Sequence, residues 1–273
     1  MARSSRDTSG GKSVSTNLSP RTGKTSSTLA VDSWRRGGGG RAIAVRVWLV
    51  GGGGSNGGGG GWSEERTFTV VSALTYGLIV AAGAGGLSQF GVFLTGISGG
   101  GQGEGASTPV QTGAGYGGGY AGGGGGGGVG GSNGGTGYTY PDHPTTGWPV
   151  RMPGAGGNGI YTDITGSNVY YAGGGAGSSN WYTIGAPAGT RGGGGGGSSH
   201  YNAGNGEANT GGGGGQAYCC AAGAGGSGIV IIRYLTAEGN PTIGAGLTAP
   251  TYATLGSDTI ATFTGGSGQI GWE

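Results

Sequence analysis

Charged residues, prolines and cysteines are scarce in this sequence, and each shortage excludes a class of protein. Only 9% of the 273 residues are charged, well below the roughly one quarter of an ordinary soluble domain. Nine prolines are too few for a collagen triple helix, and the glycines occur in runs instead of at every third position. Two cysteines cannot form a disulfide framework. The chain is therefore neither collagen nor a disulfide-stabilised secreted module.

The two cysteines are neighbours, Cys219 and Cys220. A disulfide between adjacent residues is strained, so we expect free thiols that pack as small apolar groups. The only histidines, His143 and His200, lie in loop-like segments, and no His/Cys spacing fits a zinc site. We predict no metal and no cofactor. A nucleophilic pair of Cys220 with His200 is disfavoured but stays open.

No motif predicts an enzyme. Asp142, Asp163 and Glu207 offer carboxylates for glycosidic cleavage, but no spacing defines a pair. Gly-Lys-Ser (11–13) and Gly-Lys-Thr (23–25) resemble the end of a phosphate-binding loop, yet each lacks the motif's first glycine and a preceding strand. We therefore predict a non-enzymatic protein.

Glycine is what the chain has in excess: 81 residues, gathered in tracts that alternate with short apolar segments. A glycine-rich chain is often a disordered linker, because glycine loses much backbone entropy on ordering and buries no side chain. Such a linker would lack large apolar groups. Here 13 Tyr, 6 Trp and 4 Phe accompany the glycines. The sequence therefore predicts a folded protein whose connections are rich in glycine. The main tracts are 51–54, 57–61, 122–128, 192–197 and 211–215.

Period-two alternation predicts strands, and no window has a helical period. In 42–50, Ile43, Val45, Val47 and Leu49 share one face. Residues 229–234 are apolar on both faces, as expected for a central strand covered on both sides. Further strands are expected at 67–71, 74–81, 90–95 and 168–172. The predicted class is all-β, an antiparallel β-sandwich of jelly-roll type in which Val45 and Val47 share a core with 229–232.

Two interpretations of the glycine tracts stay open. They are either long loops at the ends of a sandwich, or extended polyproline-II-like segments packed side by side. Such segments make no internal hydrogen bonds, so each N–H must find a partner on a neighbour or on water. Glycine permits the close approach that this packing requires.

Charge divides the chain into an arm and a body. Residues 1–41 hold eight basic residues against two acidic ones, whereas the remainder holds five arginines against nine acidic residues. The arm is rich in Ser and Thr and cannot fold alone. We expect either a solvated tail or a peptide that anchors on a partner; an arm that binds nucleic acid is the least favoured interpretation. The anchoring residues would be Arg3, Arg6, Lys12, Arg21 and Lys24. The expected organisation is 1–41 as the arm, 42–235 as a glycine-rich β domain and 236–273 as a short β-rich C-terminal segment.

Four blocks carry a resemblance to a known family: 44–54 (AVRVWLVGGGG), 166–175 (GSNVYYAGGG), 209–215 (NTGGGGG) and 225–234 (GGSGIVIIRY). In this order they resemble the glycine-rich domain of viral, especially tailed-phage, fibre and appendage proteins, over about 42–234. Members of this family commonly begin with a strand of the Phe-Thr-x-Ser-Gly-Thr type. None precedes Ala42, and a similar element occurs at 260–270.

The resemblance implies a virion structural protein, exposed as a tail or capsid fibre and involved in particle assembly and host attachment. It implies other virion proteins as partners, trimeric assembly, and synthesis in the host cytoplasm. The absence of an apolar stretch behind the basic start agrees with that location, and no segment is long enough to insert in a membrane. The arm would enter the particle, and the body would be exposed.

Aromatic residues on loops are candidates for recognising a host-surface glycan or protein, because they present large flat contacts at low entropic cost. The candidates are Trp148, Trp181, Tyr182 and Tyr201. Their other interpretation is core filling between glycine tracts. Two alternative functions remain: a capsid decoration protein without receptor binding, and an RNA-binding glycine-rich protein, which the acidic body disfavours. We therefore expect no nucleic-acid partner.

Overall fold

We describe residues 40–96, 138–140, 150–178, 192, 195–198 and 200–273 in a computed structural model of the chain. The proposed anchoring residues, all in 1–39, lie outside these ranges. The described residues form strands, turns and extended segments, and their only helical element is a 3-10 turn at Thr236–Glu238. The prediction of an all-β protein is confirmed.

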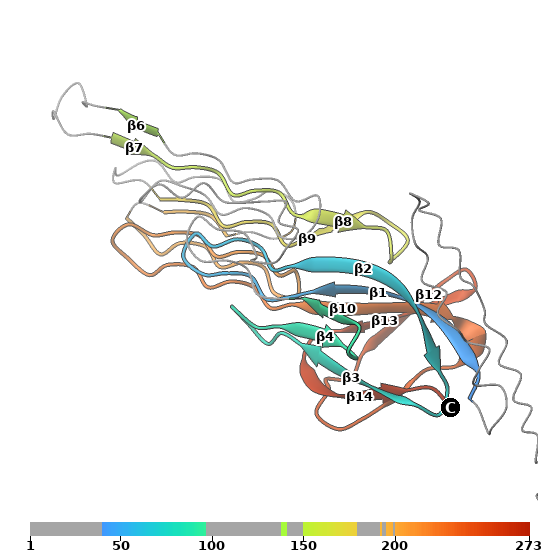
Figure 1. Cartoon of the computed structure of the whole chain (residues 1–273). Helices are drawn as coiled ribbons and strands as arrows, with labels where there is room; N and C mark the ends of the chain where they lie inside the picture. Colours follow the sequence, from blue (N-terminus) through green and yellow to red (C-terminus); the bar gives the residue numbers. More distant parts are fainter. Residues whose placement is uncertain (1–39, 97–137, 141–149, 179–191, 193–194, 199) are drawn as a thin grey trace, which may run out of the picture. The chain divides into compact units, whose positions relative to one another are not determined.

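The first sheet has five antiparallel strands in the order β12-β13-β10-β1-β2 (Figure 1). β10 lies at its centre, as the apolar character of both its faces predicted. The register of β1 is continuous on both sides: Val47 is opposite Ile232 of β10 and opposite Arg66 of β2. The strands are β1 (Ala42–Val50), β2 (Ser63–Val71), β10 (Ile229–Leu235), β12 (Thr251–Leu255) and β13 (Asp258–Phe263).

A second five-stranded antiparallel sheet has the order β11-β14-β3-β4-β5. Its strands are β3 (Thr75–Val80), β4 (Ser88–Phe90), β5 (Leu94–Gly96), β11 (Thr242–Ile243) and β14 (Gly266–Gly271). Two hairpins complete the described strands: β6 (Tyr138–Tyr140) with β7 (Val150–Met152), and β8 (Ile160–Thr162) with β9 (Val169–Tyr171).

The predicted strands are found with different bounds; β2, for example, begins at Ser63 instead of residue 67. The strand expected at 90–95 is divided between β4 and β5, because Gly91 has a positive φ of 56° and starts a turn. The segment expected at 74–81 begins one residue later, and Leu74 is half exposed instead of facing the core.

One core joins the two sheets. It includes Ile43, Val45, Val47 and Leu49 of β1, as the alternation predicted, and Leu78, Phe90 and Phe263 from neighbouring strands. The prediction that Val45 and Val47 share this core with 229–232 is correct for Val230 and Ile232. It is wrong for Ile229 and Ile231, because alternate residues of a strand point to opposite faces; these two belong to a second cluster.

The second cluster covers the other face of the first sheet near the end of β1. Trp48, Val50, Ile229 and Ile231 supply the sheet side, and the β8–β9 hairpin covers them with Tyr171, Ala172 and nearby Ile164. The Trp48 and Tyr171 rings lie 5.7 Å apart, centroid to centroid. Tertiary packing thus places the hairpin over this end of the sheet.

Residues 236–273 supply strands to both sheets. β12 and β13 extend the first sheet beyond β10, and β11 and β14 extend the second beyond β3. The sequence predicts 236–273 as a short C-terminal segment after 42–235, and in the structure 40–273 form one compact unit. The similar element noted at 260–270 contributes to β13 and β14.

Candidate functional site: the glycine tracts and their exposed turns

The glycine tracts leave the first sheet at one end. Val50, the last residue of β1, is opposite Ser63 of β2 and Ile229 of β10. The tract after β1 and the tracts before β2 and β10 therefore all begin at this end. In Figure 1 they run beside one another as thin lines beyond these strands.

Within the described residues, hydrogen bonds between backbone N–H and C=O groups join the glycine tracts to one another. Gly213 N–H donates to Gly173 O at 2.7 Å, and three residues further on Gln216 N–H donates to Ala176 O at 2.8 Å. The same three-residue step recurs across the bundle, in the same direction on both segments where they run parallel and in opposite directions where they run antiparallel, whereas a β-ladder repeats every two residues. Further parallel pairs, written donor to acceptor, are 173 to 192 with 176 to 195, 195 to 213 with 198 to 216, and 203 to 221 with 206 to 224. The antiparallel pairs are 53 to 226 with 56 to 223, and 226 to 212 with 223 to 215.

The packing leaves no room for side chains at many of these glycines. A Cβ on Gly213 would lie 2.0 Å from the carbonyl oxygen of Gly58 and 2.7 Å from the nitrogen of Gly175. A Cβ on Gly175 would lie 2.0 Å from Gly214 O, and one on Gly223 would lie 2.0 Å from Gly204 O. Glycine is required here by close backbone approach from several sides. We call these segments (51–61, 172–178, 195–198, 203–215 and 223–228) the glycine bundle.

A few polar side chains fix the turns of the bundle. Asn202 Oδ1 accepts from Ala221 N–H, and Asn205 Oδ1 accepts from Ala224 N–H, which repeats the three-residue step. Gln216 is 2% exposed, and its Oε1 accepts from Ser178 N–H at 3.3 Å. These side chains bind backbone groups that the turns would otherwise leave without a partner.

Aromatic and thiol side chains are presented on the turns. Tyr201 is 76% exposed and Tyr218 is 46% exposed. Both are tied to Ser198: its Oγ accepts from Tyr201 N–H, and its carbonyl oxygen accepts from Tyr218 N–H. Of the four aromatic residues proposed for recognition, only Tyr201 is described; Trp148, Trp181 and Tyr182 lie outside the described residues.

The cysteines differ from expectation. Cys219 and Cys220 are free thiols, as predicted, but both are exposed, so the prediction that they pack as small apolar groups is wrong. They lie on a turn between two glycine segments of the described chain. Cys220 Sγ lies 3.3 Å from the backbone oxygen of His200, so the described contact between these two residues involves the main chain of the histidine.

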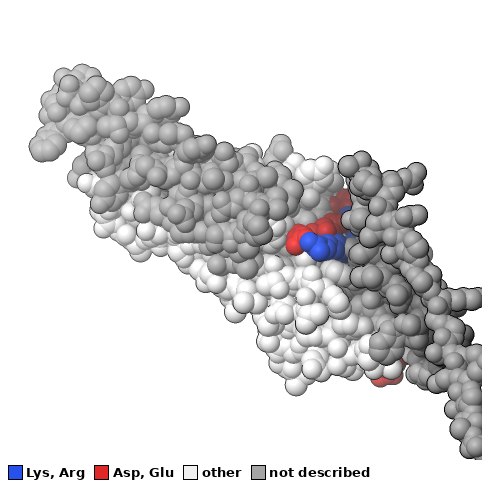
Figure 2. Space-filling model, viewed as in Figure 1, with Lys and Arg blue, Asp and Glu red and all other residues white. Residues whose placement is uncertain are grey.

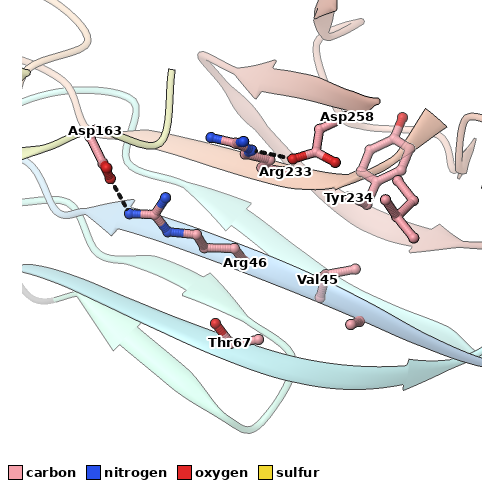
Figure 3. Close-up of a pocket in the computed structure, with 9 residues that line it drawn as sticks. Val45, Arg46, Thr67, Asp163, Arg233, Tyr234 and Asp258 are labelled. Atoms are coloured by element: carbon pink, nitrogen blue, oxygen red, sulfur yellow. Dashed lines mark hydrogen bonds and ion pairs between the residues drawn. The ribbon is translucent and has the colours of Figure 1, made fainter. Parts of the chain in front are cut away.

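A shallow hollow of about 410 Å³ lies on the outer face of the first sheet. Arg46 of β1 and Arg233 of β10 are directly opposite in the register, and both line it. Figure 3 shows Asp163 reaching Arg46 and Asp258 reaching Arg233. Glu65 of β2 also pairs with Arg46. The two arginines thus lie on the same face of the sheet, and each is paired with a carboxylate.

The electrostatics of the hollow are those of ion pairs. The hydrogen bond and the charge of Arg46 lower the pKa of the Asp163 carboxyl, which stabilises the ionised form. A general acid needs the opposite shift. Of the other two carboxylates considered for cleavage, Glu207 lies on a bundle turn, where its backbone oxygen accepts from Thr210, and Asp142 lies outside the described residues.

Each arginine whose side chain is described is paired with a carboxylate. Arg41 pairs with Glu238 at 2.6 Å and Arg66 pairs with Glu64, in addition to the pairs in the hollow. On the face drawn in Figure 2, the described charged side chains gather mainly in one small area. RNA phosphates require unpaired basic groups, and these arginines do not supply them.

The described residues hold no candidate metal site and no candidate membrane-spanning helix. No group of three or more His, Cys, Asp or Glu in this part of the chain is placed to hold a metal ion. Among the same residues, no helix has the length and apolar character needed to cross a bilayer.

Comparison with protein-family models, with curated proteins and with solved structures gave no match to this chain. The resemblance of 42–234 to the glycine-rich viral domain therefore stays a prediction.

Sequence reasoning did not find the charged hollow. The available signal was an arginine at an outward position of each central strand, Arg46 and Arg233. What could not be read from the sequence was that these positions are opposite each other, because register depends on long-range pairing.

Proposed function

We propose that this chain is a structural protein of the exterior of a virus particle, a fibre or appendage subunit whose glycine bundle holds recognition turns away from the β-sheets. The observation that supports this most is the bundle itself. Its segments are held by backbone hydrogen bonds between neighbours and not by a hydrophobic core. Such a scaffold presents exposed turns with very little charge or apolar surface of its own.

We infer that the bundle segments adopt the polyproline-II form, as polyglycine II. That helix has three residues per turn and makes no internal hydrogen bonds. Both properties fit the three-residue step between partners and the donation of N–H groups to neighbouring segments. A residue and the one three further on then face the same neighbour, as Gly213 and Gln216 face 173–176.

We also infer a jelly-roll-like connectivity for the two sheets. The chain passes between them repeatedly: β2 to β3, β10 to β11, β11 to β12 and β13 to β14 each change sheet. Such crossings are typical of double-sheet jelly rolls, which occur in viral structural proteins among others.

The proposed partners are a host-surface glycan or protein at the turns and other virion proteins at the arm. Tyr201 and Tyr218 are exposed on neighbouring turns, so together they offer a flat amphipathic contact. Trp148, Trp181 and Tyr182 remain proposed recognition residues on the sequence argument alone. Trimeric assembly is part of the proposal and follows from the resemblance.

Deletion of the arm tests the proposed role as a virion protein. Virus particles are assembled with the full chain or with a variant lacking 1–33, and incorporation is measured by immunoblot of purified particles. We expect the variant to retain the wild-type circular dichroism spectrum and to be absent from particles, because the arm holds most of the basic charge and the described strands begin at Ala42. Normal incorporation of the variant would contradict the anchoring role.

A further inference from the structure

The exposed turn that carries Cys219 and Cys220 brings the two sulfurs together. The Sγ atoms are 2.7 Å apart, and both side chains are exposed. A disulfide bond is about 2.05 Å long, so bond formation requires the two atoms to approach by well under an ångström. Adjacent cysteines in an extended segment would direct their side chains to opposite faces; here the turn directs them to the same side.

Contacts on both sides of the cysteines fix this turn. Ala217 forms a bridge with Ser198, and Tyr218 N–H donates to Ser198 O at 3.2 Å. After the cysteines, Ala221 N–H donates to Asn202 Oδ1 at 3.2 Å. Cys220 Sγ itself donates to the backbone oxygen of His200 at 3.3 Å. The backbone of the turn is thus held by hydrogen bonds to Ser198 and Asn202 in which the thiols take no part.

We propose that Cys219 and Cys220 form a reversible vicinal disulfide by exchange with a small-molecule disulfide of the oxidised-glutathione type. One cysteine thiolate attacks a sulfur of the oxidant, whose S–S bond breaks and releases one glutathione thiolate. The second cysteine thiolate then attacks the protein sulfur of the mixed disulfide, and the second glutathione leaves as a thiolate. Two protein S–H bonds and one oxidant S–S bond are replaced by one protein S–S bond and two glutathione S–H bonds.

The hydrogen bond between the thiols, followed by burial, raises the pKa of the Cys220 thiol above its ordinary value. The thiolate is the nucleophile in exchange, so the thiol that ionises attacks first and the other resolves the mixed disulfide. The short distance between the sulfurs favours the resolving step over addition of a second glutathione.

The proposed disulfide is a reversible switch and does not stabilise the fold appreciably. It closes a ring that contains only the two cysteines, so it removes little chain entropy from the unfolded state, since that effect grows with loop length. Strained and exposed disulfides have the more oxidising potentials and are the labile ones. The turn therefore carries thiols in a reducing compartment and a disulfide in an oxidising medium, next to exposed Tyr218 and Tyr201.

The test uses the purified full chain, reduced and then equilibrated in buffers with increasing ratios of oxidised to reduced glutathione. Samples are quenched in acid, alkylated with iodoacetamide and analysed by intact and peptide mass spectrometry. We expect both thiols to be lost together, with no glutathione attached to the protein. The peptide that contains both cysteines should escape alkylation and be lighter by two hydrogens than the same peptide with two free thiols. Excess reduced glutathione should restore both thiols.

Two variants give matched controls. Cys220→Ser and Cys219→Ser each keep one thiol without a resolving partner, so we expect both variants to accumulate the glutathione mixed disulfide. Wild-type protein that carries one or two glutathiones at equilibrium, or that forms disulfide-linked dimers instead of the internal bond, would overturn the proposal.

Discussion

Gly213 donates its backbone N–H to the carbonyl oxygen of Gly173 at 2.7 Å, and so joins two segments that are 40 positions apart in the chain. Its own carbonyl oxygen accepts from Gly195 at 2.6 Å. One glycine thus links three segments of the bundle. The stability of the bundle should depend on such residues.

Gly213→Ala should destabilise the protein by at least about 2 kcal/mol, because overpacking of a close-packed region costs about 1–3 kcal/mol and here the obstacles are backbone atoms. The added Cβ would lie 2.0 Å from Gly58 O. Urea unfolding followed by circular dichroism gives the free energy of unfolding. The control is Gly83→Ala, where a Cβ meets no atom within 4 Å. Equal stability of the two variants would argue against the packed bundle.

Ser88→Ala should cost about 1–3 kcal/mol, the penalty for leaving buried polar groups without partners. Ser88 is fully buried; its Oγ donates to Val50 O at 2.7 Å and accepts from Ala81 N–H at 3.0 Å. It therefore connects the end of β1 with the end of β3. The exposed Ser257→Ala serves as control, and thermal unfolding of both is the measurement. A loss no larger than that of the control would show that the bridge does not contribute.

Asp258→Asn should lower the free energy of unfolding by about 0.5–1 kcal/mol, the range of a partly exposed ion pair. The change removes the carboxylate that pairs with Arg233 at 2.7 Å, while Arg46 stays opposite Arg233 in the register. The loss should shrink in high salt, which screens the remaining repulsion. Glu64→Gln, at a more exposed pair with Arg66, is the control and should have a smaller effect. A loss independent of salt would contradict this electrostatic account.

Tyr234→Phe should make the loss of stability at alkaline pH less steep. Burial raises the pKa of the Tyr234 hydroxyl above the value of about 10 for an exposed tyrosine. The folded state therefore favours the neutral form, so its contribution is complete below about pH 10 and falls as the pH rises further. At neutral pH the variant loses the hydrogen bond to Asn240, worth about 1 kcal/mol. Urea unfolding from pH 8 to pH 11 measures both effects, and identical slopes for variant and wild type would refute the assignment.

Much of the fold could be predicted from local pattern. The alternation in β1 identified its core face, and the apolar run in β10 identified a central strand, because both signals depend on side-chain period alone. The division of Ile229 and Ile231 from Val230 and Ile232 also follows from that period. Residues 229–232 therefore form two contact surfaces, one on each face of the sheet.

The remaining features depend on long-range pairing. The sequence left two interpretations of the glycine tracts open, because glycine adopts many conformations and only the neighbours of each tract fix one. The same holds for the opposition of Arg46 and Arg233 and for the strands that 236–273 adds to both sheets. The exposure of Cys219 and Cys220 results from the turn between two bundle segments, which composition does not specify.

The measurement that tests the central proposal most directly is antibody labelling of intact particles. Antibodies raised against 40–273 are applied to purified particles of the virus that encodes the chain, and gold-conjugated secondary antibodies are located by electron microscopy. The account predicts labels on the exterior, at a fibre or another appendage. Particles that bind no antibody, although disrupted host cells contain the protein, would contradict it.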